Sequence, residues 1–319
     1  MRRASRFAGA AAALLAIAGC ATAPRFDAAV LEPTELADVP FFPQTQYQCG
    51  PAALATILAY EGVPVDAGDL APAVYVEGLR GSLQAELLGA TRRHGFVPYP
   101  IEATPEALFD EVAEGKPVLV LQNLGLKRLP VWHYAVVIGF DDDSGRVLLR
   151  SGTERRRAER LDGFLRSWRL GGNWGFVAAA PGELPATATP ERYVRAVAGA
   201  ESLLSPAAAD AAYAAAADRW PEEPLALFAL AGRHAGAERW DAAATAYRTL
   251  LRVDPDHAAA RNNLANVLAE RGCRDEALRQ ARAALDLVGD DSPLRPAIED
   301  TVESLSGTGS GPEPGHCRA

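Results

Sequence analysis

Hydrophobic and polar positions follow two different patterns along the chain, and the pattern changes near residue 182. Across residues 37–182, amphipathic stretches are interspersed with short runs of apolar and β-branched residues. Helical stretches and buried strands that follow one another in this way are typical of an α+β domain. Across residues 183–305 the pattern is helical and rich in alanine. We therefore expect an α+β domain followed by an all-α domain, with a flexible tail over residues 306–319.

The elements of the α+β domain are predicted from residues that start and stop helices. A first helix is predicted from Gly50-Pro51 to Tyr60, because proline is well tolerated in a first helical turn. Ser82 is a good N-cap for a second helix that continues to about Arg93. Apolar, β-branched runs predict strands at residues 117–121, 134–138 and 146–149, and one more strand that includes Trp168 and residues 173–177.

The helical part repeats with a period of 34 residues. The period superposes Ala209, Ala243 and Ala277, then Tyr213, Tyr247 and Ala281, then Pro221 and Pro255. This spacing resembles tetratricopeptide repeats, in which a small residue lets two helices approach and a proline ends the second helix. The repeat from Pro224 to His257, with Ala231 at its small position, is the clearest, and a degenerate repeat precedes it. Such an array implies a protein partner.

The N-terminus has the layout of an export signal. Three arginines precede an apolar run over residues 7–18, which is too short to span a bilayer about 30 Å thick. The sequence Ile17-Ala18-Gly19-Cys20 resembles the lipobox of bacterial lipoproteins. That resemblance implies a signal peptide over residues 1–19, a lipid on Cys20 and a tether over residues 20–36. Because Ala21 follows the cysteine, it also implies the periplasmic face of the outer membrane.

Charge and composition exclude several classes of protein. The net charge of the 319 residues is −9, and it becomes three units more negative once Arg2, Arg3 and Arg6 are removed, which argues against nucleic acid as a partner. The four cysteines show no close pairs, so a zinc module or a disulfide framework is not expected. A disulfide between Cys273 and Cys317 is possible after export, and the sequence alone leaves open whether they pair. No cofactor or metal is expected, because the remaining histidines lack the spacing of a metal site: His94, His234, His257 and His316.

Cys49 is a candidate nucleophile. It lies at the start of the first predicted helix, where the helix dipole and unpaired N–H groups are expected to lower the pKa of a thiol. The Cys49 N–H can point at a developing oxyanion, and Gln44 can offer a side-chain N–H to the same oxygen. Gln48 and Gln46 are weaker alternatives for that role.

A second motif supplies a candidate base. His133 begins the apolar strand in Trp132-His133-Tyr134-Ala135-Val136-Val137-Ile138-Gly139, where an imidazole without a partner would be a poor choice. Together with Gln-Cys-Gly-Pro-Ala at residues 48–52, this motif resembles the bacteriocin-processing, double-glycine-leader cysteine peptidases, a branch of the papain-like fold. The resemblance implies that Cys49 is the nucleophile, His133 the general base and acid, and Gln44 the oxyanion donor.

The residue that orients the histidine departs from this family. The family has an aspartate on the following strand, usually before a proline, whereas this chain has Leu149-Arg150-Ser151-Gly152-Thr153-Glu154. Ser151 matches by family position and Glu154 by chemistry, since the hairpin register places about residues 152–156 opposite His133. Asn173 is a third candidate, because papain-like enzymes often use an asparagine beside a tryptophan.

The sequence therefore predicts a lipid-anchored periplasmic cysteine peptidase that acts through a thiolate–imidazolium pair. A peptide or protein substrate is expected at the cysteine, and the repeats are expected to dock the substrate or a partner. Two alternatives stay open: a binding or assembly lipoprotein with a weakened peptidase domain, and an amidase or transferase that acts on cell-wall peptides. The lipid would be the only link to the membrane.

Overall fold

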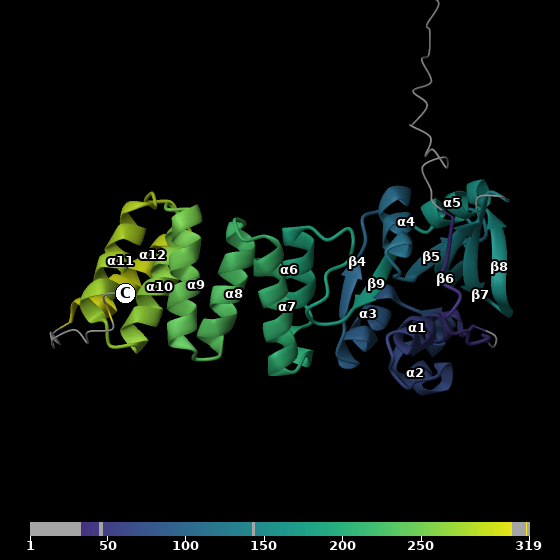
Figure 1. Ribbon diagram of the computed structural model, residues 1–319, viewed down its shortest axis with the longest axis horizontal. Helices are drawn as coiled ribbons and strands as arrows, with labels where there is room; N and C mark the ends of the chain where they lie inside the picture. Colours follow the sequence, from purple (N-terminus) through teal and green to yellow (C-terminus); the bar gives the residue numbers. More distant parts are fainter. Residues whose placement is uncertain (1–32, 45–46, 142–143, 308–316, 318–319) are drawn as a thin grey trace, which may run out of the picture. The chain divides into compact units, whose positions relative to one another are not determined.

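The computed structural model in Figure 1 describes residues 33–44, 47–141, 144–307 and 317. The predicted signal peptide and the predicted lipidation site Cys20 lie outside the described residues. Within those residues, no helix combines the length and apolar character needed to cross a bilayer.

An antiparallel sheet forms the centre of the first domain. Its strands lie in the order β4-β9-β5-β6-β7-β8, and the short β1 pairs with β6. The strands are β1 (Thr34–Glu35), β4 (Val97–Pro100), β5 (Val118–Asn123), β6 (Trp132–Asp141), β7 (Arg146–Ser151), β8 (Glu154–Arg160) and β9 (Gly175–Ala179). The three central apolar runs are confirmed as strands β5, β6 and β7. A separate two-stranded sheet joins β2 (Tyr75–Val76) to β3 (Gly81–Ser82), with the short 3-10 helix η2 (Glu77–Leu79) between them.

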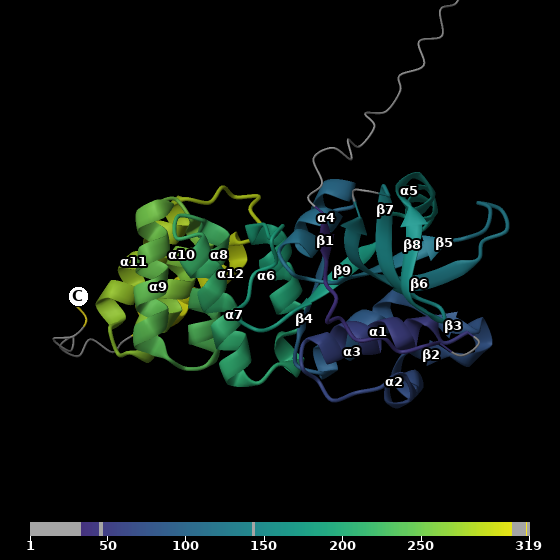
Figure 2. The same cartoon turned by 45° about the vertical axis from the view of Figure 1, so that its right-hand side comes forward.

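Helices cover both faces of the large sheet, as Figure 2 shows. On one face lie α1 (Cys49–Tyr60), α2 (Ala67–Val74) and α3 (Gln84–Arg93), and on the other lie α4 (Pro105–Ala113) and α5 (Leu161–Leu170). Leu54, Ile57 and Leu58 of α1 pack against Val136 and Ile138 of β6 in a buried apolar cluster. Helix α1 is buried along nearly its whole length, so its N-terminus is held firmly against the sheet.

The structure differs from three details of the predicted elements. Trp168 lies in helix α5 rather than in a strand, where its ring stacks on Phe164 and its indole N–H donates to the carbonyl of Trp174. Ser82 is not a helix cap, because it belongs to β3 and α3 begins at Gln84. Only the last part of the predicted strand around residues 173–177 is extended, since Asn173 adopts a positive φ of 51° in the preceding turn.

The last residues of the predicted tether belong to the sheet. Thr34 lies opposite Phe140 and Glu35 opposite Gly139, at the far end of β6 from His133. Only glycine fits at position 139, because a Cβ there would collide with the carbonyl oxygen of Thr34. The Glu35 carboxylate also accepts hydrogen bonds from the Arg156 guanidinium of β8. The chain therefore enters the first domain at a fixed point.

The second domain is all-helical. It contains α6 (Pro190–Ala198), the 3-10 helix η3 (Glu201–Leu203), α7 (Pro206–Arg219), α8 (Pro224–Gly236), α9 (Trp240–Val253), α10 (Ala258–Glu270), α11 (Arg274–Asp286) and α12 (Arg295–Ser306). Helices α8 and α10 begin one 34-residue period apart, as do α9 and α11. Ala209, Ala243 and Ala277 are buried at equivalent positions, and so are Tyr213, Tyr247 and Ala281. The helical hairpins thus confirm the predicted repeat.

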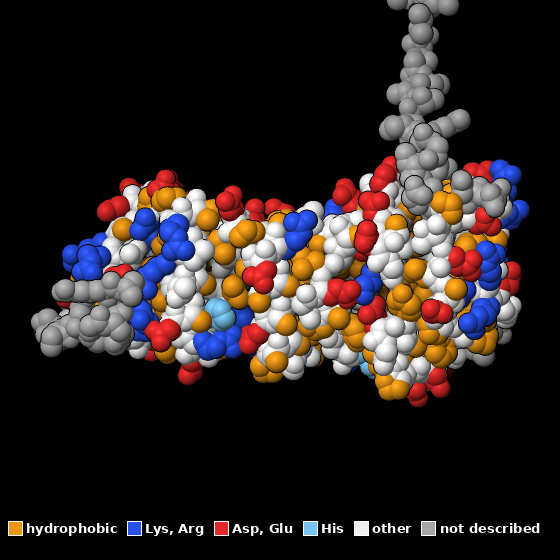
Figure 3. Space-filling view, in the orientation of Figure 1, with side chains coloured by type: hydrophobic (Ala, Val, Ile, Leu, Met, Phe, Trp, Pro, Cys, Tyr) orange, Lys and Arg blue, Asp and Glu red, His pale blue; other side chains and the backbone are white. Residues whose placement is uncertain are grey.

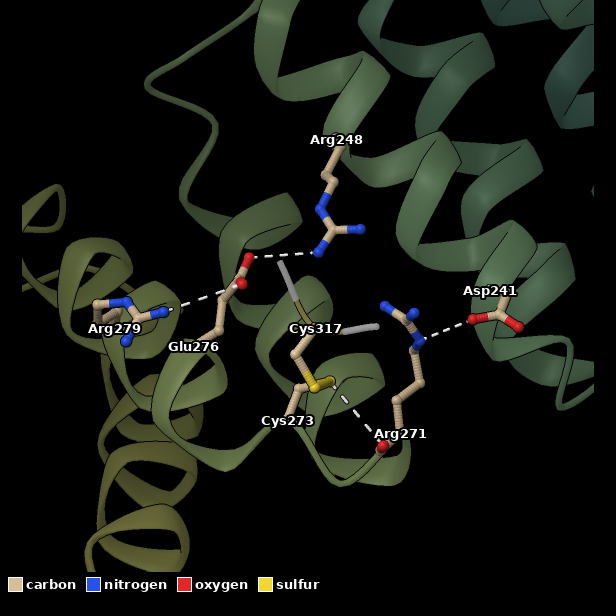
Figure 4. The surroundings of a disulfide bond; sticks show 7 residues. All are labelled: Asp241, Arg248, Arg271, Cys273, Glu276, Arg279 and Cys317. Atoms are coloured by element: carbon tan, nitrogen blue, oxygen red, sulfur yellow. Dashed lines mark hydrogen bonds and ion pairs between the residues drawn. A yellow bond between two sulfur atoms is a disulfide. The ribbon is translucent and has the colours of Figure 1, made fainter. Parts of the chain in front are cut away.

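A disulfide joins Cys273 and Cys317, a pairing that the sequence left open. Helix α12 packs against α10 and α11, and so returns the chain towards the turn that holds Cys273. Sequence spacing could not show this approach, because the two cysteines lie 44 residues apart. Both are fully buried, and ion pairs of the neighbouring helices flank the bond (Figure 4).

Hydrogen bonds fasten the segment between the two domains to the first domain. The buried carboxyl group of Glu111 in α4 accepts from the backbone N–H groups of Ala186 and Thr187 and from the Thr187 hydroxyl. The Tyr99 hydroxyl donates to the Thr187 carbonyl at 2.9 Å. Lys116 bridges Glu61 and Glu183 at 3.1 and 2.8 Å. The sequence at this point is rich in proline and threonine, but its backbone is held on several sides.

Candidate active site

The candidate residues meet at one end of the sheet. Gln44, Cys49, His133 and Ser151 line a single cavity of about 1020 Å³. Cys49 is the first residue of α1, His133 is the second residue of β6, and Ser151 is the last residue of β7. Three segments that are distant in the sequence thus converge on one hollow.

Cys49 is the first residue of α1 and the free cysteine among the described residues. Gln48 precedes it as the N-cap but makes no capping hydrogen bond with its side chain. The following residue, Gly50, is buried against Ser82, and a Cβ at this position would collide with the Ser82 hydroxyl oxygen. Gly50 therefore lets β3 approach the helix closely beside the thiol.

His133 and Ser151 form a direct contact. Nε2 of the imidazole lies 2.8 Å from Oγ of Ser151, and both side chains are buried. When Nε2 carries the ring hydrogen, it donates to Ser151 and leaves Nδ1 free to accept a proton. Ser151 is thus the one of the three candidate orienting residues that reaches His133.

The other two candidates lie elsewhere. The Glu154 side chain is 58% exposed and forms an ion pair with Arg157 at 3.1 Å. Asn173 donates from its side-chain nitrogen to the carbonyl of Ala103 at 2.9 Å, which fixes the turn before β9. Neither residue lines the cavity of Cys49 and His133.

Gln44 is the glutamine candidate that reaches the cavity. Its backbone N–H donates to the carbonyl of Gly152 at 3.1 Å, so it is held next to the end of β7. Gln48 does not line this cavity, and Gln46 lies outside the described residues.

Burial controls the electrostatics of the site. Desolvation raises the pKa of the Cys49 thiol, and the backbone N–H groups of Tyr134, Gly50 and Cys49 act in the opposite direction without reversing the shift. This result corrects the expectation that the helix N-terminus would lower the thiol pKa. The helix dipole stabilises a thiolate by a modest amount, whereas removal of an anion from water costs more.

The imidazole responds in the complementary way. Burial lowers the pKa of His133 to about 4, and the positive charge of Arg157 contributes in the same direction. The hydroxyl of Ser151 supplies no negative charge to oppose these effects. The thiol and the imidazole are therefore both neutral at pH 7 in the free protein.

Sequence reasoning missed several residues around the cavity. Gln122 of β5 lies opposite His133, is buried, and donates to the Ser167 hydroxyl of α5 at 2.8 Å. Arg157 and Glu159 of β8 also line the cavity. The short β2–β3 sheet forms another wall through Leu79, Arg80 and Ser82. The signal for these residues was weak, because β8 is polar and β2 and β3 span two residues each.

Comparisons with known proteins bear on the same part of the chain. Residues 36–173 match the model of the Peptidase_C39 like family. No curated protein matches the sequence. The part of the chain that carries Cys49 and His133 is therefore similar to C39-like peptidases.

Solved structures resemble each of the two domains. A structure described as a C39-like peptidase from Bacillus anthracis is 19% identical, with a TM-score of 0.40, and the match covers 46% of this chain and 98% of that one. A double glycine motif protease from an AMS/PCAT transporter, in complex with its leader peptide, is 22% identical with a TM-score of 0.36, covering 45% of this chain and 94% of that one. The secretion chaperone SycD of Yersinia enterocolitica, in complex with a peptide of the translocator YopD, is 13% identical with a TM-score of 0.34, covering 36% and 91%.

Proposed function

We propose that this protein is a lipid-anchored cysteine peptidase that cleaves peptide bonds of a protein or peptide substrate. The observation that carries the proposal is the shared cavity of Cys49 and His133, in which Ser151 holds the imidazole by a hydrogen bond. The family of residues 36–173 supports a peptidase in general. In this proposal Cys49 is the nucleophile and His133 the general base and acid.

In each half of the reaction His133 accepts one proton and then returns it. Nδ1 of His133 accepts the thiol proton as Sγ of Cys49 attacks the carbonyl carbon of the substrate. The backbone N–H of Cys49 and the side chain of Gln44 stabilise the oxyanion that forms. The carbon–nitrogen bond then breaks, and His133 returns its proton to the departing amine. Water attacks the thioester with His133 as base, which releases the acid and restores the thiol.

The pKa values set the timing of the first transfer. Because burial raises the pKa of Cys49 and lowers that of His133, the free protein favours the neutral pair. The thiolate–imidazolium pair therefore forms during attack, when the oxyanion and its donors offset the separated charges. A resting ion pair is not needed for this mechanism.

The anchor and the compartment are further parts of the proposal. Signal cleavage before Cys20 and lipid attachment to it would place the protein at the periplasmic face of the outer membrane. The disulfide of Cys273 and Cys317 supports an oxidising compartment, because such bonds are rare in the cytosol. In a detergent partition assay, Cys20→Ala should move the protein from the detergent phase to the aqueous phase. Retention of Cys20→Ala in the detergent phase would contradict the lipid anchor.

The helical repeats would dock the substrate or a partner protein. Stacked helical hairpins present an extended surface for peptides and proteins.

Among the described residues, no group of three or more histidine, cysteine or acidic side chains is arranged to bind a metal ion.

A comparison of protein N-termini tests the proposal. Periplasmic extracts that lack the protein are incubated with purified wild type or with Cys49→Ser, and new N-termini are identified by mass spectrometry. Wild type should create new N-termini that Cys49→Ser and His133→Ala do not create. Glu154→Gln is the matched control, since this exposed carboxylate lies outside the cavity and its loss should leave cleavage intact. Identical N-termini with wild type and Cys49→Ser would overturn a peptidase.

One observation favours a second candidate function. The neutral Ser151 and the low pKa of His133 are what a domain with weakened turnover would show. In that case the protein would bind its partner without cutting it, and the extracts would contain partners captured by Cys49→Ser and wild type alike. An amidase or transferase of cell-wall peptides would instead alter those peptides and create no protein N-termini.

A further inference from the structure

The loop between β5 and β6 is an ordered hairpin that exposes large apolar side chains. We refer to residues 124–131 as the β5–β6 hairpin. The side chains of Leu126 and Leu129 are among the most exposed large apolar groups of the described residues, at 60% and 73%. Leu124 and Val131 are also about half exposed, as is the adjoining Trp132. Exposed apolar groups collected in this way mark interaction surfaces more often than isolated ones do.

The hairpin is built to hold this shape. The side-chain oxygen of Asn123 accepts hydrogen bonds from the backbone N–H groups of Gly125 and Val131, at 3.0 and 2.9 Å. Leu126 and Leu129 exchange backbone hydrogen bonds across the tip, both at 3.1 Å. A Cβ on Gly125 would collide with the carbonyl oxygen of Leu129, so the two arms lie unusually close. The apolar side chains are therefore displayed on a preformed element.

The hairpin is continuous with the candidate active site. Leu124, Val131 and Trp132 line the cavity that contains Cys49 and His133. Tyr47, Leu79 and Leu83 line the same cavity and are also exposed. A chain segment seated at Cys49 would therefore meet apolar side chains from the hairpin and from these residues.

Cations accompany these apolar groups. Lys127 and Arg128 form the tip of the hairpin, between Leu126 and Leu129, and both are exposed. Arg80, which also lines the cavity, lies over the ring of Tyr47 at 5.8 Å. Both Arg80 and Tyr47 have positive φ angles, of 49° and 66°, which are rare for residues other than glycine and cluster at functional sites. No ion pair of the described residues neutralises Lys127, Arg128 or Arg80.

The hairpin and the short strand β1 lie at opposite ends of β6. Thr34 of β1 pairs with Phe140. The hairpin adjoins Trp132, eight residues away along the same strand, which corresponds to roughly 26 Å.

We propose that the β5–β6 hairpin docks the substrate and selects a segment that carries bulky apolar side chains together with carboxylates. The apolar side chains would cover Leu126, Leu129 and Trp132, and the carboxylates would neutralise Lys127 and Arg128. This inference rests on the proposed function in one respect, because it takes the occupant of the cavity to be a polypeptide. The hairpin would therefore bind segments of small residues poorly.

Peptide binding to the full chain carrying Cys49→Ala tests the inference without turnover. Fluorescence anisotropy compares a labelled peptide rich in Leu, Phe and Glu with one that has Ala for Leu and Phe, and with one that has Lys for Glu. The first peptide should bind at least about tenfold more tightly than either control, a difference of about 1.4 kcal/mol. The double change Leu126→Ser/Leu129→Ser should remove most of this advantage. Leu203→Ser is the matched control, because Leu203 is 50% exposed outside the cavity.

Charge reversal provides a test that misfolding cannot imitate. Lys127→Glu/Arg128→Glu should weaken binding of the Glu peptide and strengthen binding of the Lys peptide. Equal affinities of the three peptides, or hairpin variants that bind like Cys49→Ala alone, would overturn the inference. Loss of binding to vesicles of anionic phospholipid in the hairpin variants, with peptide binding unchanged, would also overturn it and assign the hairpin to the membrane.

The outcomes separate this inference from the proposed function. Binding of the Leu, Phe and Glu peptide to Cys49→Ala without cleavage by wild type would contradict a peptidase and leave the docking role supported. Cleavage by wild type with no preference among the three peptides would support a peptidase and overturn the docking role.

Discussion

Ser151 determines the electrostatic character of the imidazole in this site. Its hydroxyl meets Nε2 of His133 at 2.8 Å and can fix the tautomer, as a carboxylate would. A hydroxyl carries no charge, however, so burial and Arg157 act unopposed and the pKa of His133 falls to about 4. The proton must then move to His133 during attack.

The pH dependence of thiol alkylation should reveal this neutral pair. An ordinary cysteine thiol ionises with a pKa of about 8.5. Because burial raises the pKa of Cys49, its thiolate forms at higher pH than that. We expect the rate with iodoacetamide to be low at pH 7 and to rise steadily into the alkaline range. His133→Ala should leave the neutral-pH rate nearly unchanged. A rate plateau between about pH 5 and 7 that His133→Ala abolishes would instead show a resting ion pair.

Replacement of Ser151 by aspartate should make His133 a stronger base. A carboxylate beside Nε2 favours the imidazolium and should raise the pKa of His133 by at least about one unit. The titration midpoint of the His133 ring protons, followed by NMR, should therefore move to higher pH in Ser151→Asp. Ser151→Asn is the control, since its amide occupies similar space without charge. Equal midpoints for Ser151→Asp and Ser151→Asn would show that charge at this position does not reach the imidazole.

At the scale of single residues, the sequence predicted which residues line the cavity better than it predicted their burial and pKa. The placement of Cys49 and His133 in one cavity followed from motifs, but the direction of the thiol pKa did not, because burial depends on the walls that β3 and β5 supply. The hairpin register pointed to residues 152–156 as partners of His133. Pairing ends instead at Arg150, and Gly152, with a φ of 64°, turns the chain into β8 and carries Glu154 away.

Close approach between α1 and β3 holds the wall of the cavity beside the thiol. A methyl group at Gly50 would collide with the hydroxyl oxygen of Ser82, whose backbone carbonyl also accepts from the Tyr134 hydroxyl at 3.1 Å. We expect Gly50→Ala to lower the free energy of unfolding by about 1–3 kcal/mol, as overpacked cores do. Urea denaturation would measure the change. Gly78→Ala, where a Cβ meets no atom within 4 Å, should be close to neutral; similar values for the two variants would contradict this packing.

At the scale of elements, buried strands were predictable and polar ones were not. The runs that became β5, β6 and β7 are apolar because both faces of the sheet are covered. Strand β8 lies at the edge and reads Glu-Arg-Arg-Arg-Ala-Glu-Arg, and Lys and Arg side chains gather over it in Figure 3. Helix α4 was overlooked although Thr104 caps it and Pro105 follows, a pattern that also begins α6.

The disulfide should stabilise the helical domain as a whole. It closes a loop of 44 residues in the unfolded chain, which corresponds to roughly 3–4 kcal/mol. Cys317→Ser should lose about this amount in chemical denaturation followed by circular dichroism, and Cys273→Ser should lose a similar amount. The double variant should be no less stable than either single one, and reductant should no longer affect it. Additive losses would show that the cysteines contribute through packing instead of through their bond.

At the scale of the whole molecule, the sequence predicted two folds in succession but not their connection. A change in pattern and a 34-residue period are local properties that one sequence displays. The disulfide and the contacts of residues 183–187 depend on segments that meet only after folding, such as Glu111 with Thr187. Residues 181–190 are rich in proline and threonine, and their hydrogen bonds to a distant buried carboxyl group leave no local signal in the sequence.

If the repeats bind the substrate of the proposed peptidase, the Glu111 contacts would help to set the distance between the bound segment and Cys49. Since Thr187 is held by Glu111 and Tyr99, and Glu183 by Lys116, the path from α4 to the first repeat helices has little freedom to stretch. A substrate gripped by the helical hairpins would then present to Cys49 only the bond that lies a set number of residues from the gripped segment. Cleavage would be selected by distance along the substrate as well as by the side chains at the cut.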